Sequence, residues 1–164
     1  MFSVIQKTTC INMKIRTFVL LASKKSKLLT GETGLLINVA ICDDMPILRE
    51  VLAEMIHTYE AEKNIKFNLC EFGSGEELLE AIDPDEKYFD VFFLDNHMKK
   101  LTGVDTALHI RQYNTDCHIV FVTASDAQYE FMSAAPLKIL RKPAQKEDVY
   151  EILDLVSACA SENG

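Results

Sequence analysis

The sequence predicts an α/β protein in which a five-stranded parallel sheet is doubly wound, with helices on both faces. From Leu35 onward, short β-branched and apolar runs alternate five times with amphipathic helical stretches. Two of these runs, 91–94 and 119–122, are apolar without interruption, as in strands that are covered on both faces. Parallel strands joined by helices take right-handed crossovers, which would place helices on both sides of the sheet.

The first predicted strand and helix follow residue 35. Residues 36–42 are mostly apolar and predict a strand, which ends in Asp43 and Asp44. Pro46 then fits the first turn of a helix that extends to about Glu62. The apolar residues of this helix recur at helical spacing: Leu48, Val51, Leu52, Met55 and Ile56.

The next elements repeat the alternation. Residues 66–72 alternate between polar and apolar side chains, which indicates a strand nearer an edge of the sheet. Ser74 and Glu77 match a capping box and predict a short helix through Ile82. Residues 88–94 then predict a third strand, which ends abruptly in Asp95.

The remaining elements complete the pattern. After Asp95, Gly103 opens a helix, and residues 117–123 predict a fourth strand that ends in a polar residue. We expect a short helix from 126 to 134 and a brief fifth strand over 137–140. The last helix is expected from Gln145 to about Cys159.

Composition and charge fit one soluble domain. The chain has 164 residues, 48% hydrophobic and 26% charged, with a net charge of −8 and a pI near 5.0. No cluster of Lys and Arg occurs beyond residue 30, so we expect no direct nucleic-acid binding. No apolar run reaches the roughly 20 residues that span a bilayer, and we expect a cytoplasmic protein.

The cysteines and most histidines carry no ligand pattern. The cysteines lack CxxC spacing and mostly lie in apolar runs, so we expect reduced core thiols rather than disulfides or zinc ligands. They are Cys10, Cys42, Cys70, Cys117 and Cys159. Three histidines without cysteine or acidic companions at ligand spacing are expected to be structural or surface residues: His57, His109 and His118.

Residues 1–34 differ in charge from the rest. They contain six basic residues and one acid, a net charge of +5, which leaves −13 for residues 35–164. We interpret 1–34 as an N-terminal extension, loosely held or due to an upstream start, with a membrane- or RNA-touching arm as the alternative. The globular domain is expected over 35–160, followed by a tail, 161–164.

Polar side chains follow four of the five predicted strands. They are Asp43, Asp44, Asp95, Thr123 and Lys142. Because these strand ends share one edge of a parallel sheet, we expect the side chains to converge. Crowded carboxylates favour a hard cation such as Mg²⁺, while a lysine and a hydroxyl suit a phosphoryl group, so the pattern predicts phosphoryl transfer. Taken singly, each residue has an ordinary alternative as a helix cap, a loop residue or a solvated charge.

The stretch from about Leu36 to Ala160 resembles the receiver domain of bacterial two-component response regulators. The matching motifs are Asp43 with Asp44, Asp95 with Met98 and Gly103, Val122–Ala124, and Lys142 with Pro143. The resemblance implies a flavodoxin-like (βα)₅ fold and a phosphorylation-controlled signalling switch. The implied partners are a histidine kinase or phosphotransfer protein, with small acyl phosphates as other donors. The implied chemistry is self-phosphorylation and autodephosphorylation, with no other enzymatic activity.

The same resemblance implies a role for each site residue. Asp95 would be the phosphoacceptor, and Thr123 and Lys142 would contact the phosphoryl group after transfer. Mg²⁺ is the implied cofactor. Its implied ligands are Asp44 and Asp95 directly, Asp43 mainly through water, and the backbone carbonyl of His97. The peptide bond between Lys142 and Pro143 would be cis.

Three positions depart from the family pattern. Lys99 and Lys100 follow Met98, where the family often has a proline. Ile139 stands where the family usually has an aromatic residue that swings inward on phosphorylation. His97 lies two residues after the implied phosphoacceptor, where side chains influence hydrolysis of the aspartyl phosphate. We therefore expect phosphorylation to change the rest of the domain in a different way, or more weakly, than in the family.

Phosphorylation is expected to change a surface made by the fourth helix, fifth strand and fifth helix, where Tyr129, Met132 and Val149 would meet an output domain or protein. The region around Ile139 suggests a regulator with a LytTR-type DNA-binding domain. Because only four residues follow Ala160, we expect a stand-alone receiver or a fragment of a longer regulator.

Two alternatives to a phosphorylated receiver remain open. One is a receiver-shaped binding module that is never phosphorylated, which Ile139 and the altered loop favour. The other is a Mg²⁺-dependent phosphohydrolase. That class usually has a second aspartate two residues after its nucleophile, where this chain has His97.

Overall fold

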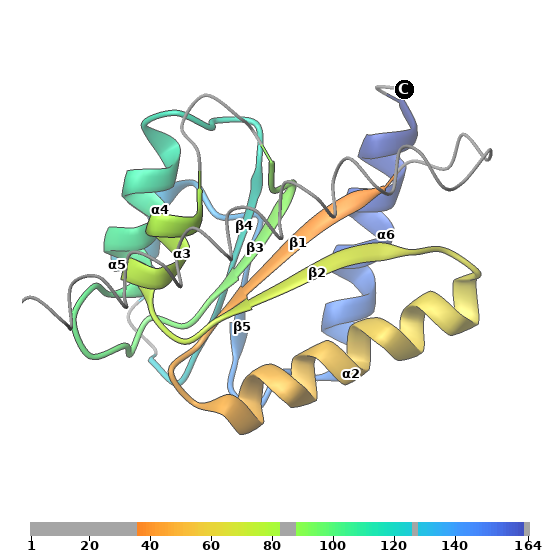
Figure 1. Cartoon of the computed structure of the whole chain (residues 1–164), viewed down its shortest axis with the longest axis horizontal. Coiled ribbons are helices and arrows are strands. Elements are labelled where there is room, and N and C mark those ends of the chain that lie inside the picture. Colours follow the sequence, from red (N-terminus) through yellow and green to blue (C-terminus); the bar gives the residue numbers. More distant parts are fainter. Residues whose placement is uncertain (1–35, 83–87, 126–127, 163–164) are drawn as a thin grey trace, which may run out of the picture.

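Five parallel strands form one sheet in the order β2-β1-β3-β4-β5, so the predicted doubly wound sheet is confirmed (Figure 1). The computed structural model describes residues 36–82, 88–125 and 128–162. The strands are β1 (Ile37–Cys42), β2 (Phe67–Phe72), β3 (Val91–Leu94), β4 (His118–Thr123) and β5 (Lys138–Arg141). The predicted extension and Cys10 lie outside the described residues.

The helices cover the sheet in two groups. One face carries α2 (Pro46–Lys63) and α6 (Lys146–Glu162). The other face carries α3 (Gly75–Ala81), α4 (Gly103–Arg111), α5 (Gln128–Phe131) and the 3₁₀ turn η1 (Met132–Ala134) (Figure 1). No helix in the described part of the chain is both long and apolar enough to cross a membrane.

Strand β3 contributes to both hydrophobic cores. Val91 and Phe93 pack with residues of α2 and α6, whereas Phe92 and Leu94 pack with residues of α3 and α4. All four side chains are at most 1% exposed. An uninterrupted apolar run is therefore what this central strand requires, since successive side chains point to opposite faces.

Caps at two helices fix the loops beside the carboxyl end of the sheet. The Ser74 hydroxyl accepts from the Glu77 amide at 3.1 Å, but the Glu77 carboxylate accepts from the Gly73 amide, so only half of the predicted capping box forms. A reciprocal capping box joins Thr102 and Asp105 at the start of α4. The spacing of these two residues, a threonine followed three residues later by an acidic residue, matches the same signature.

Two predictions about exposure are wrong in part. Cys42 and Cys117 are buried free thiols and Cys70 is half-buried, but Cys159 is exposed on α6, so it is not a core thiol. Val149 is fully buried between α6 and the sheet, because its side chain lies on the inner face of the amphipathic helix. It cannot line the predicted output surface, where Tyr129 and Met132 are exposed.

Candidate functional site

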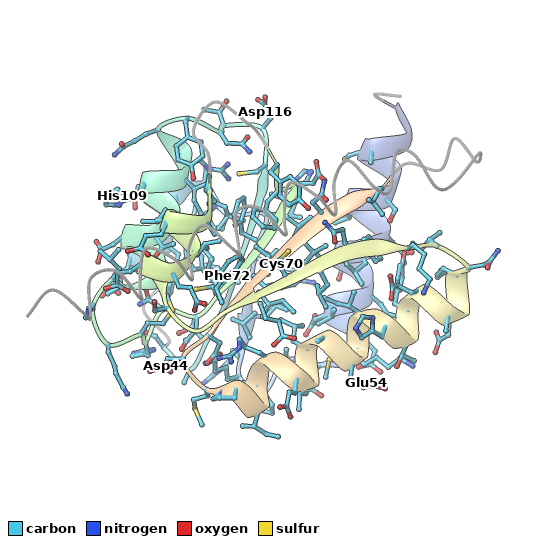
Figure 2. The ribbon with its side chains drawn as sticks, in the orientation of Figure 1. Asp44, Glu54, Cys70, Phe72, His109 and Asp116 are labelled. Carbon is cyan, nitrogen blue, oxygen red and sulfur yellow. The ribbon has the colours of Figure 1, made fainter. Side chains whose placement is uncertain are left out.

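The predicted site residues lie where the strands end. Figure 2 shows Asp44 at the carboxyl end of the sheet and Asp116 at the opposite end. Backbone hydrogen bonds continue one residue past the strands: the Asp43 amide donates to the Phe72 carbonyl at 3.2 Å, and the Asp95 amide donates to the Cys42 carbonyl at 2.8 Å. The sheet itself therefore brings the two acids to one place.

Three carboxylates converge as predicted. Asp43, Asp44 and Asp95 each offer an oxygen atom within 4.8 Å of the other two. Asp43 is 6% exposed and Asp95 is 3% exposed, whereas Asp44 is half-buried. Buried carboxylates at this separation repel one another unless a cation lies between them.

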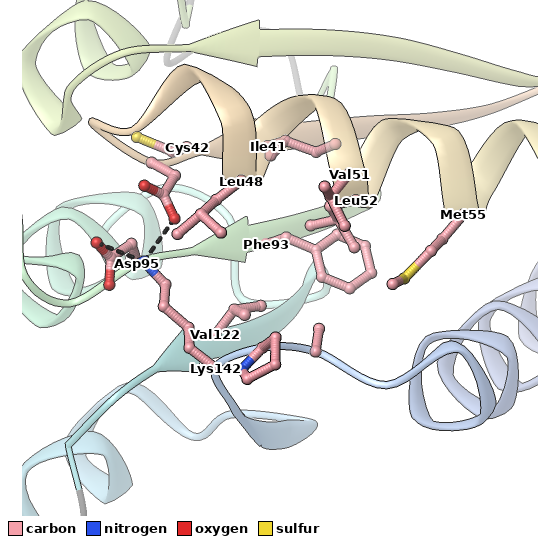
Figure 3. A pocket seen from close by; sticks show the side chains of 13 residues that line it. Ile41, Cys42, Leu48, Val51, Leu52, Met55, Phe93, Asp95, Val122 and Lys142 are labelled. Atoms are coloured by element: carbon pink, nitrogen blue, oxygen red, sulfur yellow. Dashed lines mark ion pairs between the residues drawn. The ribbon is translucent and has the colours of Figure 1, made fainter.

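Lys142 supplies one such cation. Its Nζ lies 2.6 Å from Asp43 Oδ2 and 2.9 Å from Asp95 Oδ2, and dashed lines mark both ion pairs in Figure 3. The peptide bond to Pro143 is cis, as the resemblance implied. Lys142 therefore contacts both the implied phosphoacceptor and a member of the acidic pair.

Arg49 supports the acidic pair, a role that the sequence did not suggest. Its Nη1 donates to the Asp43 carbonyl at 2.6 Å, and its Nε lies 3.4 Å from Glu71 Oε2. The Asp43 carboxylate in turn accepts from the Met45 amide at 2.9 Å. A positive charge in the first turn of a helix interacts unfavourably with the helix dipole. The position of Arg49 near the start of α2 is therefore the sequence feature that could have indicated this role.

The Asp95 loop is held against the start of α4. Asn96 is 8% exposed, and its side-chain oxygen accepts from the Val104 amide at 3.2 Å. A Cβ atom at Gly103 would lie 2.4 Å from the Asp95 carbonyl oxygen and 2.9 Å from its carbonyl carbon. Only glycine allows this close approach, so Gly103 belongs to the site through its backbone.

Thr123 and His97 lie beside the carboxylates. Thr123 is fully buried at the end of β4, and its Oγ1 accepts from the Ser125 amide at 3.1 Å. His97 is exposed, and its amide donates to Asp95 Oδ1 at 3.1 Å. Its ring Nδ1 lies 3.4 Å from Thr123 Oγ1, a side-chain contact that the sequence did not predict.

The neighbouring thiol is inert. Cys42 directly precedes the acidic pair, and burial, followed by the charges of Glu77 and Asp43, raises the pKa of its thiol to about 12. Its sulfur contacts the sulfur of Met98 at 3.5 Å. Because only a thiolate is a good nucleophile, Asp95 and not Cys42 is the candidate nucleophile here.

A small cavity adjoins the ion pairs. Asp43, Asp95 and Lys142 lie at its polar end, and apolar residues of β1, β3, β4 and α2 line the remainder together with Pro143 and Ala144 (Figure 3). Its volume of about 40 Å³ admits water but is far below the roughly 300 Å³ of pockets that enclose small molecules. Ile139, at the position of the family's aromatic residue, is half-buried and packs against the core beneath α3 and α4.

Comparisons with known proteins place this site in a family. The model of the response regulator receiver domain matches residues 39–154. The positive alginate biosynthesis regulatory protein of Pseudomonas aeruginosa is 30% identical over 121 residues, 73% of this chain and 47% of that protein. A nitrate/nitrite response regulator protein homolog of Haemophilus influenzae is 27% identical over 118 residues, 70% of this chain and 54% of that protein. The chain thus spans about half the length of these curated relatives.

Solved structures agree on the fold. The response regulator protein TrrA of Thermotoga maritima, crystallised with Mg²⁺ and BeF, has a TM-score of 0.61 at 22% identity, over 73% of this chain and 98% of that one. The response regulatory domain of mrkE from Klebsiella pneumoniae has a TM-score of 0.66 at 23% identity, over 77% and 99%. With the family model matching most of the chain, the protein belongs to the response regulator receiver domain family.

Proposed function

We propose that this protein is a signalling switch that is phosphorylated on Asp95 by a histidine kinase, a phosphotransfer protein or a small acyl phosphate. The observation that carries the proposal is the convergence of three carboxylates within 4.8 Å, with the Lys142 ammonium 2.9 Å from Asp95. A candidate nucleophile, oxygen atoms that would suit a metal ion and a cation that would suit a phosphoryl group thus lie at one edge of the sheet.

The donor set fits Mg²⁺. Carboxylate oxygens are the ligands that this hard cation prefers, and it usually takes few protein ligands and keeps several waters. Asp44 and Asp95 would bind it directly, Asp43 mainly through water, and the His97 carbonyl would complete the protein ligands. When bound, the ion would neutralise charge on the phosphoryl oxygens.

Transfer requires few steps from the protein. An Asp95 carboxylate oxygen attacks the phosphorus atom, a new O–P bond forms, and the bond to the donor's imidazole nitrogen or acyl oxygen breaks with its electron pair. Lys142 stays beside the new phosphoryl oxygens, and the Thr123 hydroxyl donates to one of them. Attack of water on the phosphorus later breaks the O–P bond to Asp95, releases inorganic phosphate and restores the Asp95 carboxylate.

The two alternatives are less well supported. A phosphohydrolase uses a second acid two residues after its nucleophile, but His97 at that position contacts Thr123. A module that is never phosphorylated would not require three carboxylates to share one edge, an arrangement that costs stability without a cation.

Two exposed surfaces suit the proposed partners. Met45, which precedes α2, and Ile47 and Val51 on α2 are each at least 43% exposed beside the acidic pair, where a phosphate donor would approach. Tyr129 is 95% and Met132 is 64% exposed on the α5 and η1 side, the proposed output surface. We place the protein in the cytoplasm, and a LytTR-type output remains a prediction.

Intact-mass measurement tests the proposal. Incubation with Mg²⁺ and acetyl phosphate should add one labile phosphoryl group to the wild type and none to Asp95→Asn. Asp148→Asn on α6 makes the same chemical change away from the site and should retain the adduct. Catalytic phosphate release without an adduct would favour the hydrolase, and an unmodified wild type with no release would favour the unphosphorylated module.

A further inference from the structure

The His97 ring is anchored beside the proposed phosphoacceptor. The backbone amide of His97 donates to Asp95 Oδ1 at 3.1 Å, which fixes the loop, and the ring Nδ1 lies 3.4 Å from Thr123 Oγ1. The His97 side chain, which departs from the family pattern, therefore contacts a specific group, the hydroxyl of Thr123. In the proposed function this hydroxyl contacts the phosphoryl group.

Thr123 has only one proton to donate. A threonine hydroxyl offers one donor and two acceptor lone pairs, and the Ser125 amide already uses a lone pair at 3.1 Å. Since Thr123 is fully buried, its hydroxyl proton needs a partner within the protein. His97 Nδ1, 3.4 Å from Thr123 Oγ1, can accept that proton in the tautomer that carries the ring proton on Nε2.

A phosphoryl oxygen on Asp95 would compete for the same proton, because phosphoryl oxygens are acceptors. We propose that His97 is a positioning residue that holds the Thr123 hydroxyl in the unphosphorylated state and opposes its turn toward the phosphoryl group. This inference rests on the proposed function of Asp95. It adds a residue that sets how readily the switch closes.

Beryllofluoride binding measures this competition without turnover. Titration in the presence of Mg²⁺, followed by NMR, should give His97→Ala a Kd about two- to fivefold lower than that of the wild type, as expected for one weak hydrogen bond. His109→Ala is the matched control. His109 is exposed on the outer side of α4, and its Nδ1 contacts the carbonyl of Asp105 within the same helix (Figure 2). Its Kd should equal the wild-type value.

A second substitution separates this role from other effects of the ring. Thr123→Val removes the hydroxyl and keeps the branched shape, and beryllofluoride still has Asp95 and Lys142 as partners in this background. His97→Ala should then produce no further change in Kd. Thr123→Val should also shift the ¹⁵N resonance of His97 Nδ1 in the free protein and leave that of His109 unchanged. His97→Asn, which places an amide near the position of Nδ1, should restore the wild-type Kd.

The outcomes distinguish the two proposals. A wild type that binds no beryllofluoride would overturn the proposed function of Asp95. Normal binding with an unchanged Kd for His97→Ala would overturn the role of His97 alone. An equal gain from His97→Ala in the Thr123 and Thr123→Val backgrounds would show that the ring acts through another route, and would also overturn the inference.

Discussion

At the scale of single residues, Gly103 shows how a residue without a side chain shapes the site. A Cβ atom at this position would overlap the Asp95 carbonyl group, whose backbone cannot move without displacing the carboxylate. We predict that Gly103→Ala lowers the free energy of unfolding by about 1–3 kcal/mol, as overpacking does, and slows phosphorylation. Denaturant unfolding and intact-mass kinetics with acetyl phosphate measure the two effects.

Gly73→Ala provides the control for this prediction. A Cβ atom there would first meet the Glu77 side chain at 3.4 Å, an ordinary contact distance. Gly73→Ala should therefore leave both the free energy of unfolding and the rate of phosphorylation close to the wild-type values. Equal behaviour of the two variants would show that the loop adapts and that the close approach at Gly103 has no functional weight.

Asp90 provides a pH-dependent prediction at the opposite edge of the sheet. Its carboxylate accepts from the Asn38 amide at 2.7 Å, but burial, the larger effect, raises its pKa above the ordinary value of about 4. The folded state therefore binds the proton of the Asp90 carboxyl group more tightly than the unfolded state does. The stabilisation that protonated Asp90 provides is lost as pH rises above about 4. The free energy of unfolding of Asp90→Asn, relative to wild type, should increase over that range.

Asp154 should behave in the opposite sense. The Tyr59 hydroxyl donates to it at 2.7 Å, and this hydrogen bond lowers the pKa of the exposed carboxyl group. The relative stability of Asp154→Asn should therefore fall as pH rises through the acidic range. Urea unfolding at a series of pH values checks both residues, and a parallel trend in the two variants would contradict the assignment.

At the scale of elements, Arg111 at the end of α4 joins three segments. Its guanidinium donates to the Ala134 carbonyl at 2.9 Å, the Ala135 carbonyl at 3.1 Å and the Cys117 carbonyl at 2.8 Å. It thus fixes the end of η1 and the start of β4 relative to α4. Lysine cannot reproduce a planar fork of donors.

We predict that Arg111→Lys lowers the free energy of unfolding by about 2 kcal/mol, the scale of a hydrogen bond to a charged group. Because the lost contacts hold η1, hydrogen exchange should also accelerate in the α5–η1 segment more than in α2. Exchange measured by mass spectrometry resolves the two regions. Uniform acceleration would indicate global destabilisation and no specific tether.

Hydrophobic periodicity was sufficient to locate most elements. Four of the five predicted strands agree with the observed bounds within one residue, because their apolar runs coincide with the paired segments. The third strand was predicted from 88 but begins at Val91. The Asp90 backbone still makes hydrogen bonds to Asn38 and His118, but the Asn38 amide donates to the Asp90 carboxylate and not to a backbone carbonyl further upstream. Of the predicted helix over 126–134, the first two residues lie outside the described part of the chain. The rest forms α5 followed by the 3₁₀ turn η1, a distinction that side-chain periodicity does not resolve.

The site was predictable where it depends on topology alone. Parallel strands bring their carboxyl ends to one edge, so the convergence of the three aspartates and Lys142 followed from the parallel direction of the strands. The contacts of Arg49 with Asp43 and of His97 with Thr123 depend on side-chain conformation, which no spacing rule encodes. The burial of Val149 agrees with the helical spacing of Val149, Ile152, Leu153 and Val156 in the last helix, which places them on one face.

At the scale of the whole molecule, the site lies where the two hydrophobic cores meet. Phe93 belongs to the core under α2 and α6, and Phe92 belongs to the core under α3 and α4. Strand β5 repeats this division, since Leu140 packs into the first core and Ile139 against the second. A change in charge at Asp95 can therefore affect the cores on both faces of the sheet. The free energy of unfolding of the whole domain should depend on which cation neutralises the Asp95 carboxylate.

Lys142 tests this dependence. Its removal leaves the buried carboxylates of Asp43 and Asp95 without their ion pairs, and breaking such a pair typically costs about 3–5 kcal/mol. We predict that Lys142→Gln lowers Tm in the presence of a chelator and that Mg²⁺ recovers part of the loss, because an ion at the carboxylates replaces the missing cation. The rise in Tm on adding Mg²⁺ should accordingly be larger for Lys142→Gln than for wild type.

Lys138→Gln on β5 is the control. It removes ion pairs to Asp148 and Glu151, which are exposed and worth about 0–1 kcal/mol, so its response to Mg²⁺ should match the wild type. Equal Mg²⁺ responses in all three proteins would show that Lys142 and the metal do not share the carboxylates.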